Sequence, residues 1–255
     1  MPAQPLISTR HLTIRFGGHV AVDRVSLDIE PFTLKSIIGP NGAGKTTFFN
    51  LLSGQYRPTE GRVYFKGVDV TRLTAAARTR LGIGRSFQLT NIFPSLPVLE
   101  NVRLAVQAQR RMGLKVWRHS RRFPELEDRA YEILETVLLQ SKWNALASEL
   151  AHGEKRKLEL GILLALEAEV LLLDEPTAGM SLEEVPTIIG LIEAIKHRRD
   201  TTILLVEHKI DMVLALSDSI AVLKDGRLIA DGTPEAISRS PEVQAAYFGG
   251  GATGA

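Results

Sequence analysis

The chain has 255 residues, of which 44% are hydrophobic and 24% charged, a composition that suits one globular domain with a subdomain. A formal net charge of +2 argues against a broad basic surface for nucleic acid, and the absence of cysteine excludes disulfides, thiolate chemistry and cysteine-ligated zinc. The N-terminus lacks the layout of a signal peptide, and Glu167 and Glu169 interrupt the most apolar region. We therefore expect a cytoplasmic protein that reaches a membrane only through a partner.

The first part of the chain alternates apolar and polar residues in a way that predicts strands at residues 11–16 and 25–30. A buried strand is predicted to run into Gly39, and TTFFNLLSG to form a helix that ends on Gly54. GRVYF and residues 82–88 are predicted strands. From about residue 89 to residue 166 the pattern becomes helical, with amphipathic helices expected at 99–109, 125–139 and 154–166.

In the last part of the chain, strands and helices alternate. VLLLD is a predicted buried strand, residues 181–197 a helix with Ser181 and Glu184 spaced as a capping box, TILLVEH a strand and residues 209–216 a helix. SIAVLKDG and RLIADG predict a terminal hairpin. Near-continuous apolar strands separated by helices indicate a mostly parallel sheet covered on both faces, hence an α/β core with a helical insertion. The Gly-rich residues 249–255 are expected to be a flexible tail.

GPNGAGKTT matches the phosphate-loop pattern G-x-x-x-x-G-K-[ST], and it lies between a predicted strand and a predicted helix. In such a loop the glycines let backbone N–H groups surround phosphate, and the helix N-terminus adds the positive end of its dipole. Lys45 is expected to reach the β and γ phosphates, and Thr46 to offer its hydroxyl to Mg²⁺. The predicted nucleotide-binding residues are Gly39, Pro40, Asn41, Gly42, Ala43, Gly44, Lys45, Thr46 and Thr47.

Four polar side chains lie at the ends of other predicted strands. Asp174 fits a magnesium role through a coordinated water, and Glu175 fits the task of orienting or deprotonating an attacking water; a solvated acidic turn is the alternative. Gln88, where the core passes into the helical insertion, is a candidate contact for Mg²⁺ or that water, although a lone Gln is most often polar surface. His208 is a candidate contact for the γ phosphate, although a lone His is usually structural.

These motifs follow one another in the order and approximate spacing of ATP-binding-cassette (ABC) ATPases, a family that the chain resembles over nearly its whole length. The resemblance implies a single domain of residues 1–248. It would comprise a P-loop NTPase (RecA-like) core at about 1–88 and 167–248, with an antiparallel β subdomain on the N-terminal side, and a helical subdomain at about 89–166. Four stretches are similar to the ATP-binding subunits of bacterial branched-chain amino-acid importers: RFGGHVAVDRVSL, GRSFQLTNIFPSLPVLENV, DEPTAGMS and DGTPEAISRSPEVQAAYFG. Urea and short-chain amide importers belong to the same broad group.

LAHGE, residues 150–154, lies where the family carries its signature, most often Leu-Ser-Gly-Gly-Gln. The resemblance implies that two ATPase subunits face each other head to tail, with the signature helix of one pointing at the γ phosphate held by the other. The residues expected to act in trans are Ala151, His152, Gly153 and Glu154. Ala151 lacks the hydroxyl of Ser. The Glu154 carboxylate should repel triphosphate unless Lys155 or Arg156 offsets its charge or it points to solvent.

Two further features carry open interpretations. Phe16 lies where the family stacks an aromatic ring on adenine, and a core-facing strand residue is the alternative. The stretch from Arg110 to Arg122 is rich in Arg and Lys around Trp117. A solvated helix face is the favoured interpretation; contact with headgroups or a membrane subunit is the second, and nucleic-acid binding the third, because the overall charge is nearly balanced.

The resemblance therefore implies a Mg²⁺-dependent ATPase subunit of an importer for branched-chain or related amino acids. Lys45, Gln88, Glu175 and His208 would be catalytic, and Thr46, Gln88 and Asp174 would serve the metal. The expected partners are a second ATPase subunit, of the same or a homologous chain, and transmembrane permease subunits that dock near the helical subdomain on the cytoplasmic face of the inner membrane.

Alternatives remain among other ABC ATPases. The chain could serve a urea or amide importer, or a lipid or lipopolysaccharide exporter. An ABC ATPase acting on nucleic acid or the ribosome is less favoured, because those usually carry two cassettes or a long coiled-coil insertion. No nucleic-acid partner is expected.

Overall fold

The computed structural model describes residues 4–86, 92–110 and 124–248, with only the backbone of residues 246–248, and it contains two sheets. The first is antiparallel, in the order β2-β1-β4-β5: His19–Ile29, Ile7–Phe16, Glu60–Phe65 and Val68–Asp69. The second runs β10-β9-β3-β8-β7-β6: Arg227–Gly232, Ser219–Lys224, Leu34–Ile38, Thr202–Val206, Val170–Asp174 and Ile83–Arg85. Its strands pair in parallel except β10, which pairs antiparallel with β9. The predicted α/β fold with an antiparallel N-terminal sheet is confirmed.

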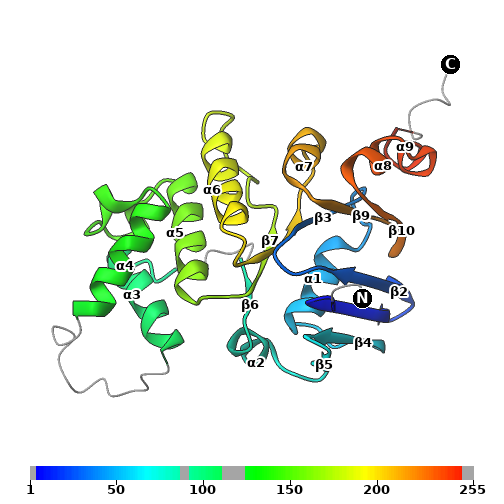
Figure 1. Ribbon diagram of the computed structural model, residues 1–255, viewed down its shortest axis with the longest axis horizontal. Helices are drawn as coiled ribbons and strands as arrows, with labels where there is room; N and C mark the ends of the chain where they lie inside the picture. Colours follow the sequence, from blue (N-terminus) through cyan, green and yellow to red (C-terminus); the bar gives the residue numbers. More distant parts are fainter. Residues whose placement is uncertain (1–3, 87–91, 111–123, 249–255) are drawn as a thin grey trace.

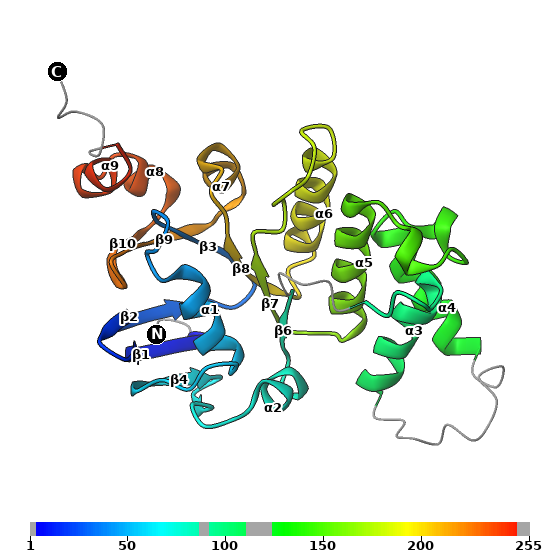
Figure 2. The ribbon, with the colours of Figure 1, turned by 180° about the vertical axis from the view of Figure 1, so that it is seen from behind.

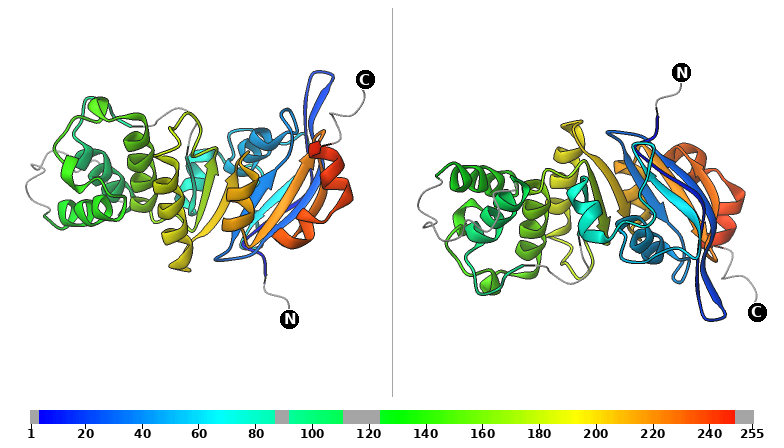
Figure 3. Two further views of the ribbon diagram at one scale, coloured as in Figure 1. Left: turned by 90° about the horizontal axis from the view of Figure 1, so that it is seen from above. Right: turned by 90° about the horizontal axis from the view of Figure 1, so that it is seen from below.

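The helices are spread along the molecule from α3 and α4 at one end to α8 and α9 at the other (Figure 1). α1 (Lys45–Ser53) and α2 (Ala75–Arg80) lie near the antiparallel sheet, and α3 (Val98–Gln109), α4 (Pro124–Thr136) and α5 (His152–Ala165) pack together at one end of an elongated molecule (Figure 3). Short 3₁₀ turns at Gln140–Lys142 and Ala147–Glu149 lead from α4 to α5. The remaining helices are α6 (Val185–His197), α7 (Ile210–Leu216), α8 (Pro234–Ser238) and α9 (Pro241–Phe248). Among the described helices, none is long and apolar enough to cross a bilayer.

The second sheet is buried on both faces, as the apolar strands predict. In β7, Leu171 and Leu173 join the core that contains α5 and α6, whereas Val170 and Leu172 join the core that contains α1 and the antiparallel sheet. This two-residue alternation is the pleat of a strand with a hydrophobic layer on each side. From behind, α1 is seen close to both sheets (Figure 2). Its Phe48 is fully buried in a core cluster to which residues of both sheets contribute.

Several helix boundaries differ from the sequence-based predictions. α4 ends at Thr136 rather than 139, because Leu138 adopts a left-handed conformation with φ 57°. α6 begins at Val185 rather than Ser181, because the backbone N–H and hydroxyl of Ser181 both donate to Glu184 in a separate turn before the helix. The predicted end of α1 is confirmed, since Gly54 caps it in the left-handed conformation.

The topology brings separate segments to one edge of the second sheet. The carboxyl ends of parallel neighbouring strands meet at the same edge, which in open α/β sheets is where ligands bind. The phosphate loop follows β3, Ser86 follows β6, Glu175 follows β7 and Glu207 follows β8. Chain segments far apart in sequence thus meet around the start of α1.

Candidate functional site

The phosphate loop, residues 39–44, joins β3 directly to α1. Gly44 is the N-cap of α1 in a left-handed conformation, φ 92°, and a Cβ atom there would overlap the carbonyl oxygen of Ala21. Only glycine fits this position. Gly42 is also left-handed, with open space where a side chain would lie. The first N–H groups of α1 have no helical partner, so together with its dipole they form a site suited to phosphate.

Lys45, the first residue of α1, closes the loop. Its buried ammonium donates hydrogen bonds to the carbonyl oxygens of Gly39, at 2.7 Å, and Pro40, at 3.0 Å. Burial lowers the pKa of Lys45, and the nearby carboxylates of Glu175 and Asp174 oppose that shift. The ammonium is therefore directed into the loop, where phosphate oxygens would be stronger partners than carbonyl oxygens because they carry charge.

Asp174 ends β7 with a fully buried side chain. Its Oδ2 accepts a hydrogen bond from Nη2 of Arg85 at 3.0 Å, whereas its Oδ1 is buried without a hydrogen-bond partner among the described residues. Burial raises the pKa of Asp174, although the Arg85 guanidinium opposes this shift. The alternative of a solvated acidic turn is therefore wrong for this residue.

The donor set fits Mg²⁺ only when a nucleotide is present. No group of three or more His, Asp or Glu side chains in the described part of the chain could hold a metal by itself. Mg²⁺, however, keeps several waters and uses one or two carboxylates together with substrate phosphates. The unpartnered Oδ1 of Asp174 and the hydroxyl of Thr46, in the first turn of α1, are donors of that kind.

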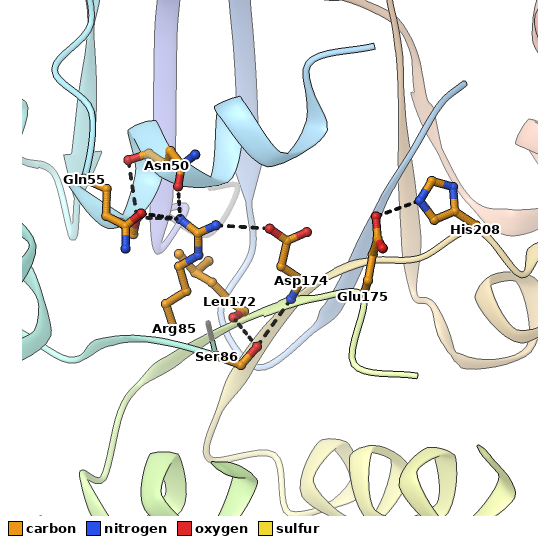
Figure 4. Close-up of polar contacts among 9 residues, drawn as sticks. Asn50, Gln55, Arg85, Ser86, Leu172, Asp174, Glu175 and His208 are labelled. Carbon is orange, nitrogen blue, oxygen red and sulfur yellow. Dashed lines mark hydrogen bonds and ion pairs between the residues drawn. The ribbon is translucent and has the colours of Figure 1, made fainter. Parts of the chain in front are cut away.

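Arg85, the last residue of β6, was not singled out by the sequence analysis. Its guanidinium reaches α1 on one side, donating to Asn50 and Ser53, and Asp174 on the other (Figure 4). A charged residue in a buried strand just before Gln88 was the signal that could have identified it. Gln88 itself lies outside the described residues, as does most of the basic stretch after Arg110.

Glu175 and His208 lie close together beside this network. Nε2 of His208 is 2.7 Å from Oε1 of Glu175, and both side chains are partly accessible to solvent (Figure 4). The backbone of Glu175 is left-handed, φ 50°, a strained conformation for a residue with a side chain. Its N–H donates to the carbonyl of Val206, so β8 holds the turn in which this residue is found.

Glu207 is a second residue whose task the sequence did not reveal. Its buried carboxylate accepts hydrogen bonds from the N–H and hydroxyl of Thr177 and from the N–H of His208. One carboxylate thus fastens the segment after β7 to the segment after β8. This connection fixes the backbone on which the Glu175–His208 pair is built.

Phe16, at the end of β1, is not a core residue. Its side chain is 46% exposed, and its ring meets the ring of Tyr56 edge to face at a centroid distance of 5.5 Å. The core-facing alternative is therefore wrong. An exposed, edge-supported ring presents a face on which a planar base can stack.

The signature stretch starts α5 earlier than predicted. The helix begins at His152, with Ala151 as its N-cap. Gly153 is buried, and a Cβ atom there would overlap the carboxylate of Glu184 in the same chain. Nε2 of His152 is 3.1 Å from the carbonyl oxygen of Ala178. Glycine at 153 thus has an intrachain packing reason, whereas Ala151 and His152 are exposed at the helix N-terminus.

Glu154 is neutralised by a residue that the sequence analysis did not consider, Lys142. Its carboxylate accepts a hydrogen bond from the N–H of Ala151 and forms an ion pair with Lys142 at 2.6 Å. Burial by itself would raise the pKa of Glu154, but these two partners hold it below its ordinary value. Arg156, one of the two residues considered for this task, pairs with the buried Glu159.

Comparisons with known proteins bear on the whole chain. A family model described as "ABC transporter" matches residues 22–178, and one described as "Branched-chain amino acid ATP-binding cassette transporter" matches residues 227–253. The chain is 40% identical over 252 residues to the high-affinity branched-chain amino acid transport ATP-binding protein LivG of Escherichia coli K12, covering 97% of this chain and 99% of the relative. It is 37% identical to BraF of Pseudomonas aeruginosa, with the same coverage.

Solved structures of ABC transporter cassettes have the same fold as this chain. The ADP conformation of MJ1267, an ATP-binding cassette of an ABC transporter, superposes with a TM-score of 0.83 at 28% identity, covering 97% of this chain and all of that one. A dimeric structure of MJ0796, a bacterial ABC transporter cassette, gives a TM-score of 0.77 at 27% identity, covering 89% of this chain and 98% of that one.

Proposed function

Because this chain belongs to the ABC transporter family of ATP-hydrolysing subunits, we propose that it powers a membrane importer of branched-chain or related amino acids. LivG and BraF, named for branched-chain amino-acid transport, are similar to it over almost their whole length. The family model over residues 227–253 carries the same description. This full-length similarity favours an amino-acid importer over the urea, lipid-export and nucleic-acid alternatives.

The observation that carries the proposed mechanism is the Glu175–His208 contact at the sheet edge where the phosphate loop begins. Glu175 would accept the proton of a water that attacks the γ phosphate, a role for which a carboxylate within hydrogen-bond reach is suited. His208, held through its backbone by Glu207, would orient that carboxylate and reach the γ phosphate. Gln88 remains a further candidate for the attacking water.

Binding of the nucleotide would rest on two contacts at opposite ends of the molecule of ATP. The exposed ring of Phe16 would stack on adenine. Lys45 and the first N–H groups of α1 would hold the β and γ phosphates, with the other residues of the loop 39–47 forming its wall. When bound between Asp174, Thr46 and the phosphates, Mg²⁺ would neutralise the charge that develops on the transferred group.

A second subunit would complete the site. The N-terminus of α5 exposes Ala151 and His152, and Lys142 neutralises the nearby Glu154. The Glu184 carboxylate beside Gly153 accepts hydrogen bonds from Ser181. Such an end suits an anion, and in the head-to-tail arrangement that anion is the γ phosphate of a partner subunit. MJ0796, a similar cassette, is known as a dimer. Permease subunits docking near α3–α5 would place the pair on the cytoplasmic face of the inner membrane.

Reconstitution tests the proposed substrate. The chain would be assembled with its permease subunits in liposomes and supplied with a matching solute-binding protein. Uptake of radiolabelled leucine should then require ATP on the side of the membrane opposite to the binding protein. Unlabelled isoleucine or valine should compete with leucine for uptake, whereas urea should not. Leucine uptake that is absent while urea or a short amide is transported would contradict the amino-acid assignment but leave the ATPase intact.

A further inference from the structure

Arg85 joins three elements that meet at the phosphate site. It ends β6, it donates through Nη1 to Asn50 and Ser53 on α1, and it donates through Nη2 to Asp174 at the end of β7. Its side chain and that of Asp174 are 6% and 0% exposed. The guanidinium also lies over the ring of Phe49, 6.0 Å from its centroid. The Arg85–Asp174 pair is buried, unlike an ordinary surface ion pair, although Asn50 is only partly buried.

The two oxygens of Asp174 have different surroundings. Oδ2 is bonded to Arg85, whereas Oδ1 has no partner among the described residues although it is fully buried. A buried carboxylate oxygen without a partner is costly, and such an atom in a folded protein calls for a ligand or water. The bond to Oδ2 fixes the rotation of the carboxylate and hence the direction of Oδ1.

We propose that Arg85 is a positioning residue, which anchors Asp174 to α1 so that Oδ1 is presented to the hydrated Mg²⁺ of the bound nucleotide. This inference rests on the proposed metal role of Asp174. Arg85 does not touch the nucleotide or the metal. It sets the distance between the carboxylate on β7 and the helix that carries Lys45 and Thr46, because one guanidinium is bonded to both.

The shape of the guanidinium explains why an arginine serves here. Its planar fork donates in two directions at fixed angles, whereas a lysine ammonium is a point charge on a flexible stem. A lysine at this position could bond to α1 or to Asp174, but it would not hold both at a fixed distance from each other. Outer partners of metal ligands that act in this way change metal affinity by about 10- to 100-fold when they are removed.

The experiment measures metal affinity without turnover. Wild type and R85Q are saturated with a non-hydrolysable ATP analogue, and Mn²⁺ binding is followed by electron paramagnetic resonance. We expect R85Q to bind Mn²⁺ about 10- to 100-fold more weakly than wild type. Its affinity for a fluorescent ATP analogue, measured in EDTA, should stay within about twofold of the wild-type value, since the phosphate loop is intact. R85K should fall between R85Q and wild type.

Arg78 supplies a matched control. It is fully buried and also bonded to α1, through the carbonyls of Leu51 and Leu52, but no carboxylate of the described residues accepts from it. R78Q should lower thermal stability and leave the Mn²⁺ affinity of the folded protein unchanged. Equal weakening in R78Q and R85Q, or unchanged affinity in R85Q, would overturn the positioning role.

A third variant separates this inference from the proposed metal site. D174N should weaken Mn²⁺ binding more than R85Q does. If D174N binds Mn²⁺ as wild type does, the metal role of Asp174 itself is wrong; if D174N weakens binding and R85Q does not, only the role of Arg85 is wrong. Should R85Q fail to fold, N50A and R85K decide in its place, because each loosens the same anchor, and wild-type Mn²⁺ affinity in both would overturn the proposal.

Discussion

Nε2 of His208 lies 2.7 Å from Oε1 of Glu175, although the two residues follow different strands and are 33 positions apart in the sequence. The contact depends on backbone hydrogen bonds that position both residues. The N–H of Glu175 is bonded to Val206 at the end of β8, and the carboxylate of Glu207 fastens Thr177 to the backbone of His208. The pair is therefore fixed by the backbone around it before any nucleotide binds.

Replacement of His208 tests the importance of that contact. His208→Ala should lower kcat for ATP by about 10²- to 10³-fold, since it removes the partner that orients a general base whose whole contribution is typically 10²- to 10⁴-fold. The affinity for ATP should change less than kcat, because His208 would reach only the γ phosphate, whereas Lys45 and the loop hold the β and γ phosphates. Steady-state ATPase assays and equilibrium nucleotide binding measure the two quantities. A variant that loses ATP binding but keeps kcat would show that His208 serves binding alone and does not orient the base.

Replacement of Phe16 tests the adenine contact. Phe16→Ala should weaken ATP binding by about 1–3 kcal/mol, the range for base–aromatic stacking in single-stranded nucleic-acid sites, with a smaller effect on kcat. Because the ring is exposed, the fold should keep its stability. Phe16→Trp is the matched control and should bind ATP at least as well as wild type. Unchanged nucleotide affinity in the alanine variant would remove Phe16 from the site.

A charge at the start of α5 tests the role of the signature in trans. Ala151→Asp should fold well, since Asp is a favourable N-cap. It should still bind ATP as a monomer, but it should lose ATP-driven dimerisation and hydrolysis, because two unit charges 4 Å apart repel by about 4 kcal/mol at an effective dielectric of 20. Ala151→Asn has nearly the same shape and capping ability without the charge.

The comparison of the two Ala151 variants is decisive when both are assayed in parallel by gel filtration with ATP and by phosphate release. The Asn variant should dimerise and hydrolyse close to wild type. If both variants behave alike, the N-terminus of α5 does not face a phosphate. If the Asp variant loses ATP binding as a folded monomer, the signature acts within its own chain.

Much of the fold follows from local patterns that burial reinforces. The apolar runs of β3, β7 and β8 could be predicted because parallel strands covered on both faces must be apolar throughout. The phosphate loop could be predicted because Gly44 meets a backbone requirement that few residues satisfy, and Lys45 follows it at the fixed spacing of the motif. Helix starts were less predictable. Ser181 and Glu184 have the spacing of a helix cap, but in the structure they form a separate turn before α6. The conformation of the chain around Glu184 determines which of these two structures forms.

The long-range polar contacts were beyond reach of the sequence. Arg85 contacts Asp174 across 89 positions, and Lys142 pairs with Glu154 although Lys155 and Arg156 are nearer in sequence. In each case the side chain's task depends on which elements pack together. Arg156 is a further example, because its buried side chain pairs with Glu159 in the next turn of α5 rather than with Glu154 at the start of the helix.

The measurement that tests the account most directly is single-turnover hydrolysis of ATP by Glu175→Gln, compared with wild type at equal nucleotide occupancy. The amide keeps the size of the side chain and loses its basicity, so bound ATP should persist and the hydrolysis rate should fall by at least about 10²-fold. Nucleotide recovered from the protein should be ATP in the variant and ADP in wild type. Hydrolysis by the variant at a rate within a few-fold of wild type would contradict the assignment of Glu175 as the base and, with it, the central role of the Glu175–His208 pair.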